Sequence, residues 1–208
     1  MAMILNEEQN MLRDSARDFV RDKAPVSALR KIRDEANPDG YDKALWKEMA
    51  DLGWAGVTIP EEFGGAEFGF QGLGVVLEET GRTLVPSPLM STVVLGASAL
   101  LLGGTDEHKS TLLSSVALGD CLLALASEEG AHHAPHGVAT TATADGDGWL
   151  INGNKTQVLD GHVANHLIVS ARTAGSAGDR DGISLFLIEA GSDGVSIDAL
   201  TMVDSRNS

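Results

Sequence analysis

The sequence of 208 residues is 43% hydrophobic and carries a formal net charge of −15, so it holds enough apolar material for one large or two modest globular domains. Because nucleic acids and anionic membrane surfaces are also negatively charged, this balance argues against both as partners. No run approaches the roughly 20 apolar residues of a membrane span, and the start of the chain lacks the cationic region of a secretion signal, so we expect a cytoplasmic protein.

The first helix is predicted to begin after Asn6, which can cap it, with Gln9 placed to close a capping box. Pro25 ends this helix because a proline cannot continue the hydrogen-bond ladder. Its apolar positions recur at helical spacing and are Leu12, Ala16, Phe19 and Val20. This stripe predicts one face packed against a core.

Two further helices are predicted before the first long loop. A short helix over Ser27–Glu35 precedes a turn at Asn37–Gly40, and the next helix begins at about Asp42. Gly53 suits the position just after the end of that helix. The following segment, Trp54–Gly65, contains Pro60 and a Gly-Gly pair, which predict an ordered loop.

The remaining helices complete an all-helical domain over residues 1–118. Taken alone, Glu78 and Glu79 are predicted to belong to a solvent-exposed face. A strongly apolar helix from about Met90 to Leu101 must be buried on more than one side. Thr105 can cap the last helix, which stops at Gly119.

From residue 119 onward the apolar period shifts towards two, which predicts a β-domain over 119–208 whose C-terminal part is incomplete. The turn at Asp145–Gly148 is a strong hairpin signal, Asn152–Asn154 suggests a second turn, and the polar loop Thr173–Gly182 is expected to be mobile. The expected fold class is α+β, with a small antiparallel sandwich or barrel after the helices. The expected strands are 122–126, 138–144, 149–151, 155–159, 166–172, 183–189 and 195–197.

Neither the cysteine nor the clustered histidines indicate a reactive or metal site. Cys121 lies in an apolar run, where a buried, inert thiol is the simpler interpretation. His132, His133 and His136 lie within five residues, but in a loop with Pro135 rather than on a rigid strand or helix, and no cysteine accompanies them. We therefore expect no metal site, although adventitious capture of nickel or zinc is credible.

Two stretches in the β-half resemble motifs of the acyl-CoA dehydrogenases. Residues 127–134, SEEGAHHA, resemble the Thr-Glu-Pro-Gly-Ala-Gly-Ser-Asp-like loop of that family. Residues 153–161, GNKTQVLDG, resemble its Gly-x-Lys-x-Trp-x-Thr-x-Gly-like strand. The loop 54–65 and the run 78–82, EETGR, stand at matching places in the helical half. The resemblance implies a flavin-dependent oxidoreductase acting on an acyl-CoA thioester, in fatty acid or steroid side-chain metabolism.

The resemblance also implies a set of FAD-binding residues at the start of the first motif. These are Ala126, Ser127 and Gly130, of which Ser127 keeps the hydroxyl that would bond the flavin ring and Gly130 keeps the loop flexible. Lys155 matches the second motif, but a solvated lysine in a hairpin is an equally good interpretation.

Several flavin-facing positions of the family are changed in this sequence. Glu129 stands where the family has proline, Gln157 where it has an aromatic ring, and Leu159 where it has threonine. The loss of a ring contact and a hydrogen bond would together weaken flavin binding by a few kcal/mol, roughly. We therefore expect that FAD is either lost from this chain or shared with a partner.

No catalytic residue can be assigned from this sequence. In the family that it resembles, the base that removes the α-proton is a glutamate in a C-terminal helical bundle, and the sequence ends at Ser208 before such a bundle. Two hypotheses remain. The chain is part of a dehydrogenase whose base lies elsewhere, or it is a non-catalytic subunit that supports a complete partner chain.

The expected partners follow from the same resemblance. They are an acyl-CoA substrate, held partly by another chain, and a dehydrogenase-like chain in a homo- or hetero-oligomer. After residue 119 the sequence offers few cations for the phosphates of CoA, namely Lys155, Arg172, Arg180 and Arg206. The side of the apolar helix at Leu95–Leu102 would meet the bundle and is expected to be exposed without it.

Overall fold

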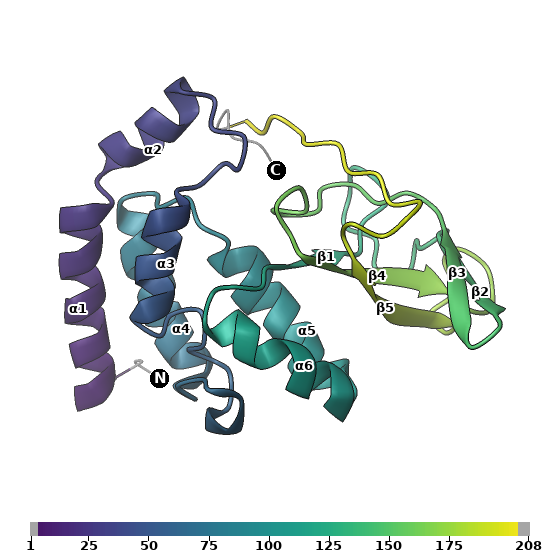
Figure 1. Cartoon of the computed structure of the whole chain (residues 1–208), viewed down its shortest axis with the longest axis horizontal. Helices are drawn as coiled ribbons and strands as arrows, with labels where there is room; N and C mark the ends of the chain where they lie inside the picture. The colour runs from purple at the N-terminus through teal and green to yellow at the C-terminus, as the bar shows by residue number, and fades with distance from the viewer. Residues whose placement is uncertain (1–3, 204–208) are drawn as a thin grey trace.

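The computed structural model describes residues 4–203, in which a helical half is followed by a five-stranded sheet (Figure 1). Within this part of the chain, no helix combines the length and apolar character that crossing a bilayer requires. The helices are α1 Glu7–Lys23, α2 Val26–Asp34, α3 Lys43–Asp51, α4 Gly69–Arg82, α5 Ser98–Gly103 and α6 Asp106–Ala117, together with the short 3₁₀ helix η1 Glu61–Phe63 and the π-helix η2 Leu89–Ala97.

The helix starts lie where their capping residues predict them. Asn6 and Gln9 form a reciprocal capping box at α1. Asp42 accepts hydrogen bonds from the first amides of α3, and Thr105 accepts one from the amide of His108 at α6. Each cap supplies an acceptor to amides that have no partner inside the helix. These local interactions are readable from sequence because donor and acceptor lie within three residues of each other.

The long apolar helix expected near residue 90 is divided in two. Leu89–Ala97 winds as a π-helix, and α5 continues it to Gly103. The helix is buried on several sides, as its composition predicts, and Leu100 belongs to the core. Leu102, in contrast, is 88% exposed. One apolar end of the Leu95–Leu102 face is therefore left in solvent.

Glu79 corrects the expectation of an exposed acidic face on α4. Its side chain is fully buried, whereas that of Glu78 is 66% exposed. Arg17 of α1 donates two hydrogen bonds to the Glu79 carboxylate, at 2.8 and 3.2 Å, and Arg82 Nε lies 3.0 Å from Oε2. The bonds from Arg17 lower the pKa of Glu79, against the opposing effect of burial. The carboxylate thus fixes α1 against α4.

The sheet is mixed rather than purely antiparallel. Its strands are β1 Leu123–Ala126, β2 Thr141–Asp145, β3 Gly148–Asn152, β4 His166–Arg172 and β5 Ile183–Glu189. The hairpins β2–β3 and β4–β5 are antiparallel, but β1 runs parallel to β4, and β2 meets the end of β4 in parallel. The reason is that the chain between β1 and β4 makes a long crossover containing the β2–β3 hairpin. The fold class, helices followed by a β-domain, is confirmed.

Two expected strands and one expected turn are wrong. The segment 155–159 is a loop because Gln157 has a φ of 54°, which a strand does not allow. The segment 195–197 pairs with no strand among the described residues. Gly153 makes no hairpin turn, and its role is close packing, since a Cβ there would lie 2.7 Å from the Cα of Thr140. The first turn, at Gly146-Asp147, joins β2 and β3 as expected.

The two halves are joined along the outer edge of β1. Thr92 of η2 accepts a hydrogen bond from the Leu123 amide at 3.1 Å and donates one to the Leu123 carbonyl at 3.3 Å. Ser91 donates to Asp160 at 2.7 Å. Threonine thus supplies the edge of β1 with a donor and an acceptor in place of a further strand. Cys121, just before β1, is buried, and burial raises the pKa of its thiol to about 11, as expected for an inert thiol.

The buried ion pair of Glu79 gives a direct test of helix packing. Glu79→Gln should lower the free energy of unfolding by about 1.5–3 kcal/mol, because charge-assisted bonds to Arg17 are lost. The matched control Glu78→Gln removes an exposed pair and should cost less than about 1 kcal/mol. Urea denaturation at neutral pH measures both.

The same pair should also give the stability a pH dependence. Since the pKa of Glu79 is lower in the folded protein, its contribution is present above the unfolded pKa and is lost as the pH falls. The difference between Glu79→Gln and the parent should therefore shrink on acidification. Equal losses of unfolding free energy for Glu78→Gln and Glu79→Gln would contradict the role of Glu79 in fixing α1 against α4.

Candidate functional site

The three residues predicted to bind a cofactor lie together where β1 ends. Ala126 is buried as the last residue of β1, and the carbonyl of Ser127 accepts a hydrogen bond from Ser170 of β4 at 3.3 Å. Gly130 is exposed further along the loop 127–140, with open space around its Cβ position. Nothing in the fold therefore demands glycine at residue 130, and this loop is the candidate site.

Lys155 corrects the interpretation of a solvated hairpin lysine. Its side chain is only 10% exposed, and its Nζ donates to Glu129 Oε1 at 2.6 Å and to Ser170 Oγ at 2.9 Å. The amide of Thr156 also bonds the carbonyl of Glu128 at 2.9 Å. The second motif therefore folds back onto the first and delivers its lysine to the loop.

Glu129 accepts hydrogen bonds from three groups of the chain. Besides Lys155, the amides of Ala139 and Thr140 donate to its carboxylate, at 2.7 and 3.0 Å. Burial by itself would raise the pKa of Glu129, but the bonds from Lys155, Thr140 and Ala139 outweigh it and lower the pKa to about 2. Glu129 is therefore ionised at neutral pH.

Glu128 is engaged on the other side of the loop. The amide of Ala134 donates to its Oε2 at 3.1 Å, and His133 Nδ1 lies 2.7 Å from Oε1. The bond from Ala134 and then that from His133 lower the pKa of Glu128. Among the described residues, no group of three His, Cys, Asp or Glu side chains is arranged to hold a metal ion.

Arg172 supports the candidate loop, a role that the sequence reasoning did not assign to it. Its guanidinium is buried at the end of β4 and donates to the carbonyls of Val138, His136, Asp179 and Asp181 at 2.7–3.0 Å. These carbonyls come from two loops, so one side chain fastens the candidate loop to the loop 173–182. An arginine closing an otherwise apolar strand, HLIVSAR, is the signal that could have suggested such a role, since buried arginine requires acceptors.

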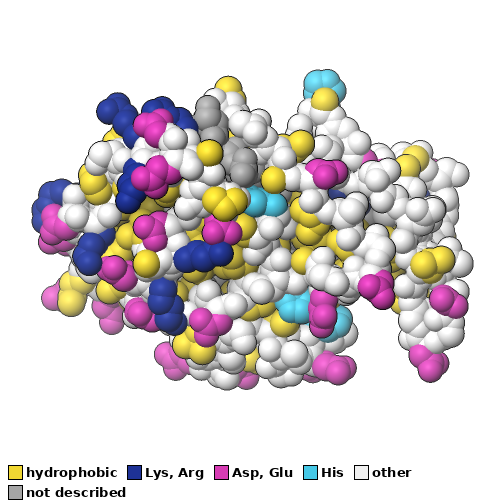
Figure 2. Space-filling view, turned by 45° about the horizontal axis from the view of Figure 1, so that its top comes forward, with side chains coloured by type: hydrophobic (Ala, Val, Ile, Leu, Met, Phe, Trp, Pro, Cys, Tyr) yellow, Lys and Arg dark blue, Asp and Glu magenta, His cyan; other side chains and the backbone are white. Residues whose placement is uncertain are grey.

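The β-half presents little positive charge to a ligand. Among its described basic residues, Lys155 is paired with Glu129 and Arg172 with carbonyls, which leaves Arg180 exposed. Arg206 lies outside the described residues. Lysine and arginine gather over the helical half in the space-filling view, and the face of the β-half shown there has few (Figure 2).

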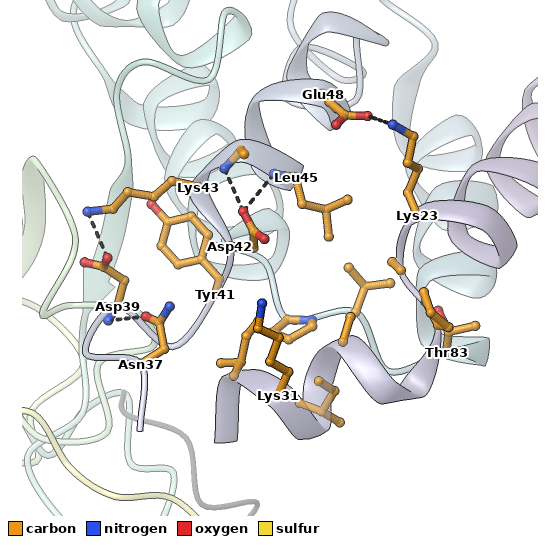
Figure 3. A pocket seen from close by; sticks show the side chains of 18 of the residues that line it. Lys23, Lys31, Asn37, Asp39, Tyr41, Asp42, Lys43, Leu45, Glu48 and Thr83 are labelled. Carbon is orange, nitrogen blue, oxygen red and sulfur yellow. Dashed lines mark hydrogen bonds and ion pairs between the residues drawn. The ribbon is translucent and has the colours of Figure 1, made fainter. Parts of the chain in front are cut away.

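A separate cavity of about 450 Å³ lies in the helical half, between the end of α1, α2 and α3 (Figure 3). The ion pairs Lys23–Glu48 and Lys43–Asp39, at 3.0 and 2.9 Å, belong to its lining. Tyr41 also lines it, and burial and then nearby Asp39 raise the pKa of that phenol. None of the predicted cofactor residues contacts this cavity, so it is distinct from the candidate loop.

Comparisons with known proteins identify the family. Residues 6–120 match the family model for the acyl-CoA dehydrogenase N-terminal domain, and residues 124–207 match the model for the middle domain. The chain belongs to the acyl-CoA dehydrogenase family. This family is flavin-dependent, and its helical-plus-β architecture is the one described above.

The relatives that this chain matches are longer than the chain itself. It is 33% identical to a 3-(aryl)acrylate reductase of Clostridium sporogenes, over 93% of this chain and 51% of that protein, and 35% identical to a (2S)-methylsuccinyl-CoA dehydrogenase of Cereibacter sphaeroides, over 89% and 34%. A solved G363A variant of the Tcur3481-Tcur3483 steroid ACAD superposes with a TM-score of 0.85 at 36% identity, covering 97% of this chain and 53% of the solved one. The chain thus spans about half the length of the relatives that it matches, or less.

The ChsE4-ChsE5 complex from Mycobacterium tuberculosis gives a second structural comparison. Its TM-score is also 0.85, at 28% identity, over all of this chain and 54% of the solved one. ChsE4-ChsE5 is a complex of two named components, and the Tcur3481-Tcur3483 protein is also named by two components.

The residues of the candidate loop do not fit a bound flavin. Its amide donors at Ala139 and Thr140 are already occupied by a carboxylate. Gln157 and Leu159, at the positions of the family's aromatic ring and hydroxyl, are exposed and supply neither. A dinucleotide carries phosphate charges, which the carboxylate of Glu129, standing where the family has proline, would repel. No reaction step is therefore assigned to these residues.

The role of Arg172 can be tested by a conservative change. Arg172→Lys keeps the charge, but a compact ammonium cannot reach four carbonyls from two loops, so some lose their donor. We expect a loss of about 1–3 kcal/mol in unfolding free energy and faster cleavage within 173–182 by limited proteolysis. Arg180→Lys is the matched control and should change neither. If the loop 173–182 is cleaved at the same rate in Arg172→Lys as in the parent, Arg172 does not hold this loop in place.

Proposed function

We propose that this chain contributes the N-terminal helical part and the middle β part of an acyl-CoA dehydrogenase assembly, and that the base of the reaction lies outside residues 1–208. In such a reaction a base takes the α-proton of an acyl-CoA thioester while a hydride leaves the β-carbon for FAD. The chain's own contribution is to present the loop 127–140 and its supporting strands.

The observation that carries this proposal is the engagement of both carboxylates in the loop. A general base needs a free lone pair and a pKa near the working pH. Glu129 is bonded by Lys155 and two amides, and its pKa is lowered to about 2. Glu128 is bonded by Ala134 and His133, and its pKa is lowered as well. Neither carboxylate is suited to removing a proton from carbon.

The substrate class follows from the family, and its binding is proposed to be shared. Acyl-CoA carries several phosphate charges, which need arginine or lysine partners. In the described β-half Lys155 is largely buried and Arg172 is buried, and both are engaged, so Arg180 is the exposed cation there. A second chain, or the remaining half of a longer one, is proposed to hold part of the CoA.

An alternative function is that of a non-catalytic subunit supporting a complete dehydrogenase-like partner. The observation in its favour is the misfit of the loop to FAD. The two-component solved relatives are consistent with it. The two functions differ in what they require of the partner. Only the alternative requires a partner that is active without this chain's loop.

The isolated chain is expected to purify without colour. Because the loop donors are occupied and no ring faces the flavin position, the absorbance spectrum after gel filtration should show no stoichiometric flavin. Calorimetric titration with an acyl-CoA should show no saturable binding at micromolar concentration. A flavin spectrum at one mole per mole of chain would contradict the misfit, and saturable micromolar binding would contradict shared substrate binding.

The same experiment with a partner tests the location of the base. Co-purified with a longer dehydrogenase-like chain, the assembly should oxidise an acyl-CoA in the presence of an artificial electron acceptor. Glu128→Gln in this chain should then keep activity within roughly tenfold, whereas loss of a catalytic base costs about 10²–10⁴. A loss in that larger range would place the base in this chain. Activity unchanged by omitting this chain would favour the non-catalytic alternative.

Exposed apolar side chains predict that the chain self-associates or binds a partner. Leu102 is 88% exposed, and Leu84 and Met90 lie at an apolar groove at the end of α4. Exposed apolar side chains that line a groove mark an interface or an aggregation liability. Light scattering at low concentration should give a mass well above 21.7 kDa, and Leu102→Ser with Met90→Ser should reduce it. A monodisperse monomer with cooperative unfolding would show that no partner is needed.

A further inference from the structure

Three donors converge on one point of the candidate loop. The amides of Ala139 and Thr140, from neighbouring residues, point at the two oxygens of the Glu129 carboxylate, and Lys155 Nζ approaches one of them at 2.6 Å. We name this set of donors the anion cradle. Successive backbone amides beside an ammonium are the arrangement by which proteins bind carboxylate and phosphate oxygens.

The anion cradle is built rigidly around this point. Lys155 is also held by Ser170, which is buried in β4, so its ammonium is fixed before any anion arrives. Thr140 is buried too. Gly153 packs against Thr140 so closely that a Cβ would collide with it. The donors therefore stay in place independently of Glu129.

The carboxylate that fills the cradle comes from a less constrained part of the chain. Gly130, the next residue, is exposed and has open space around its Cβ position, and residues 131–137 are exposed as well. No strand pairing holds Glu129 itself. The backbone on its N-terminal side is held by bonds to the carbonyls of Ser127 and Glu128, and the Glu129 carboxylate itself is held by the donors of the cradle.

We propose that Ala139, Thr140 and Lys155 form a binding site for a small oxyanion, a carboxylate or a phosphate, and that Glu129 occupies this site as an internal anion. While Glu129 is in place, an external oxyanion meets no free donor and is repelled by two carboxylates. Displacement of Glu129 would free the donors and loosen the loop 127–140 at the same time. The site is thus closed by the chain itself.

A Glu129 carboxylate that fills an anion-binding site can be told apart from one that makes an ordinary structural ion pair. A merely structural Glu129 would lose stability on truncation, and no added anion would restore it. A cradle emptied of its carboxylate has a buried ammonium and unsatisfied amides, which cost free energy until an anion enters. Chemical rescue by a free anion therefore distinguishes the two.

The test uses Glu129→Ala in the full chain, with Glu62→Ala as the control that removes an exposed acidic side chain elsewhere. Thermal unfolding is followed against sodium acetate and, separately, inorganic phosphate, with chloride matching the ionic strength. At about ten times the dissociation constant, a bound anion should raise the melting temperature of Glu129→Ala by roughly 3–6 °C. The parent and Glu62→Ala should show no such saturable rise.

The outcomes separate clearly. Rescue by acetate alone assigns the cradle to carboxylates, and rescue by phosphate assigns it to phosphates. No saturable rise beyond that of Glu62→Ala, or an equal rise in the parent, would overturn the proposal. If Glu129→Ala does not fold, the same titration is made with Glu129→Gln, which keeps the length of the side chain and removes its charge: a saturable rise in melting temperature supports the proposal, and no rise overturns it. Because no readout is enzymatic, failure here is independent of the proposed function.

Discussion

The candidate loop depends on the ion pair between Glu129 and Lys155. Glu129 follows β1, and the two amides that donate hydrogen bonds to its carboxylate precede β2. Lys155 follows β3 and also donates a hydrogen bond to Ser170 of β4. One carboxylate thus ties together four segments of the β-half. Burial of two charges is costly unless their remaining hydrogen bonds are satisfied. Here the amides and the serine supply those bonds, which explains why the pair is tolerated.

The position of this loop relative to the helical half is fixed by a second set of contacts. Thr92 of η2 satisfies both backbone groups of Leu123, and Ser91 donates to Asp160 in the loop that follows Lys155. A Cβ on Gly96 would lie 2.4 Å from that of Leu123, so glycine permits this close approach. The π-helix therefore serves as the support on which the first strand and the candidate loop are placed. Loss of these contacts would move the site as a unit.

Sequence reasoning succeeded where the determining interactions are local. Helix caps, the β2–β3 turn and the strands β4 and β5 follow from residues a few positions apart. It failed for Glu79, whose position predicts a solvent-exposed face, and it left Lys155 open between a motif residue and a solvated lysine. Glu79 is buried and Lys155 is largely buried because their partners, Arg17 and Glu129, lie far along the chain. The family resemblance located the loop, but a motif letter does not reveal which donors its carboxylate will occupy.

The chain keeps the two-domain framework of the acyl-CoA dehydrogenase family, and in its altered loop the Glu129 carboxylate occupies the donors of Ala139, Thr140 and Lys155. The most direct measurement is the titration of the Glu129 side chain by carboxyl-detected NMR. With the anion cradle in place, Glu129 should titrate at a pKa of about 2, well below the ordinary value of 4.5, and the stability that it confers should be lost as the pH falls between these values. A Glu129 pKa near 4.5 would contradict the account.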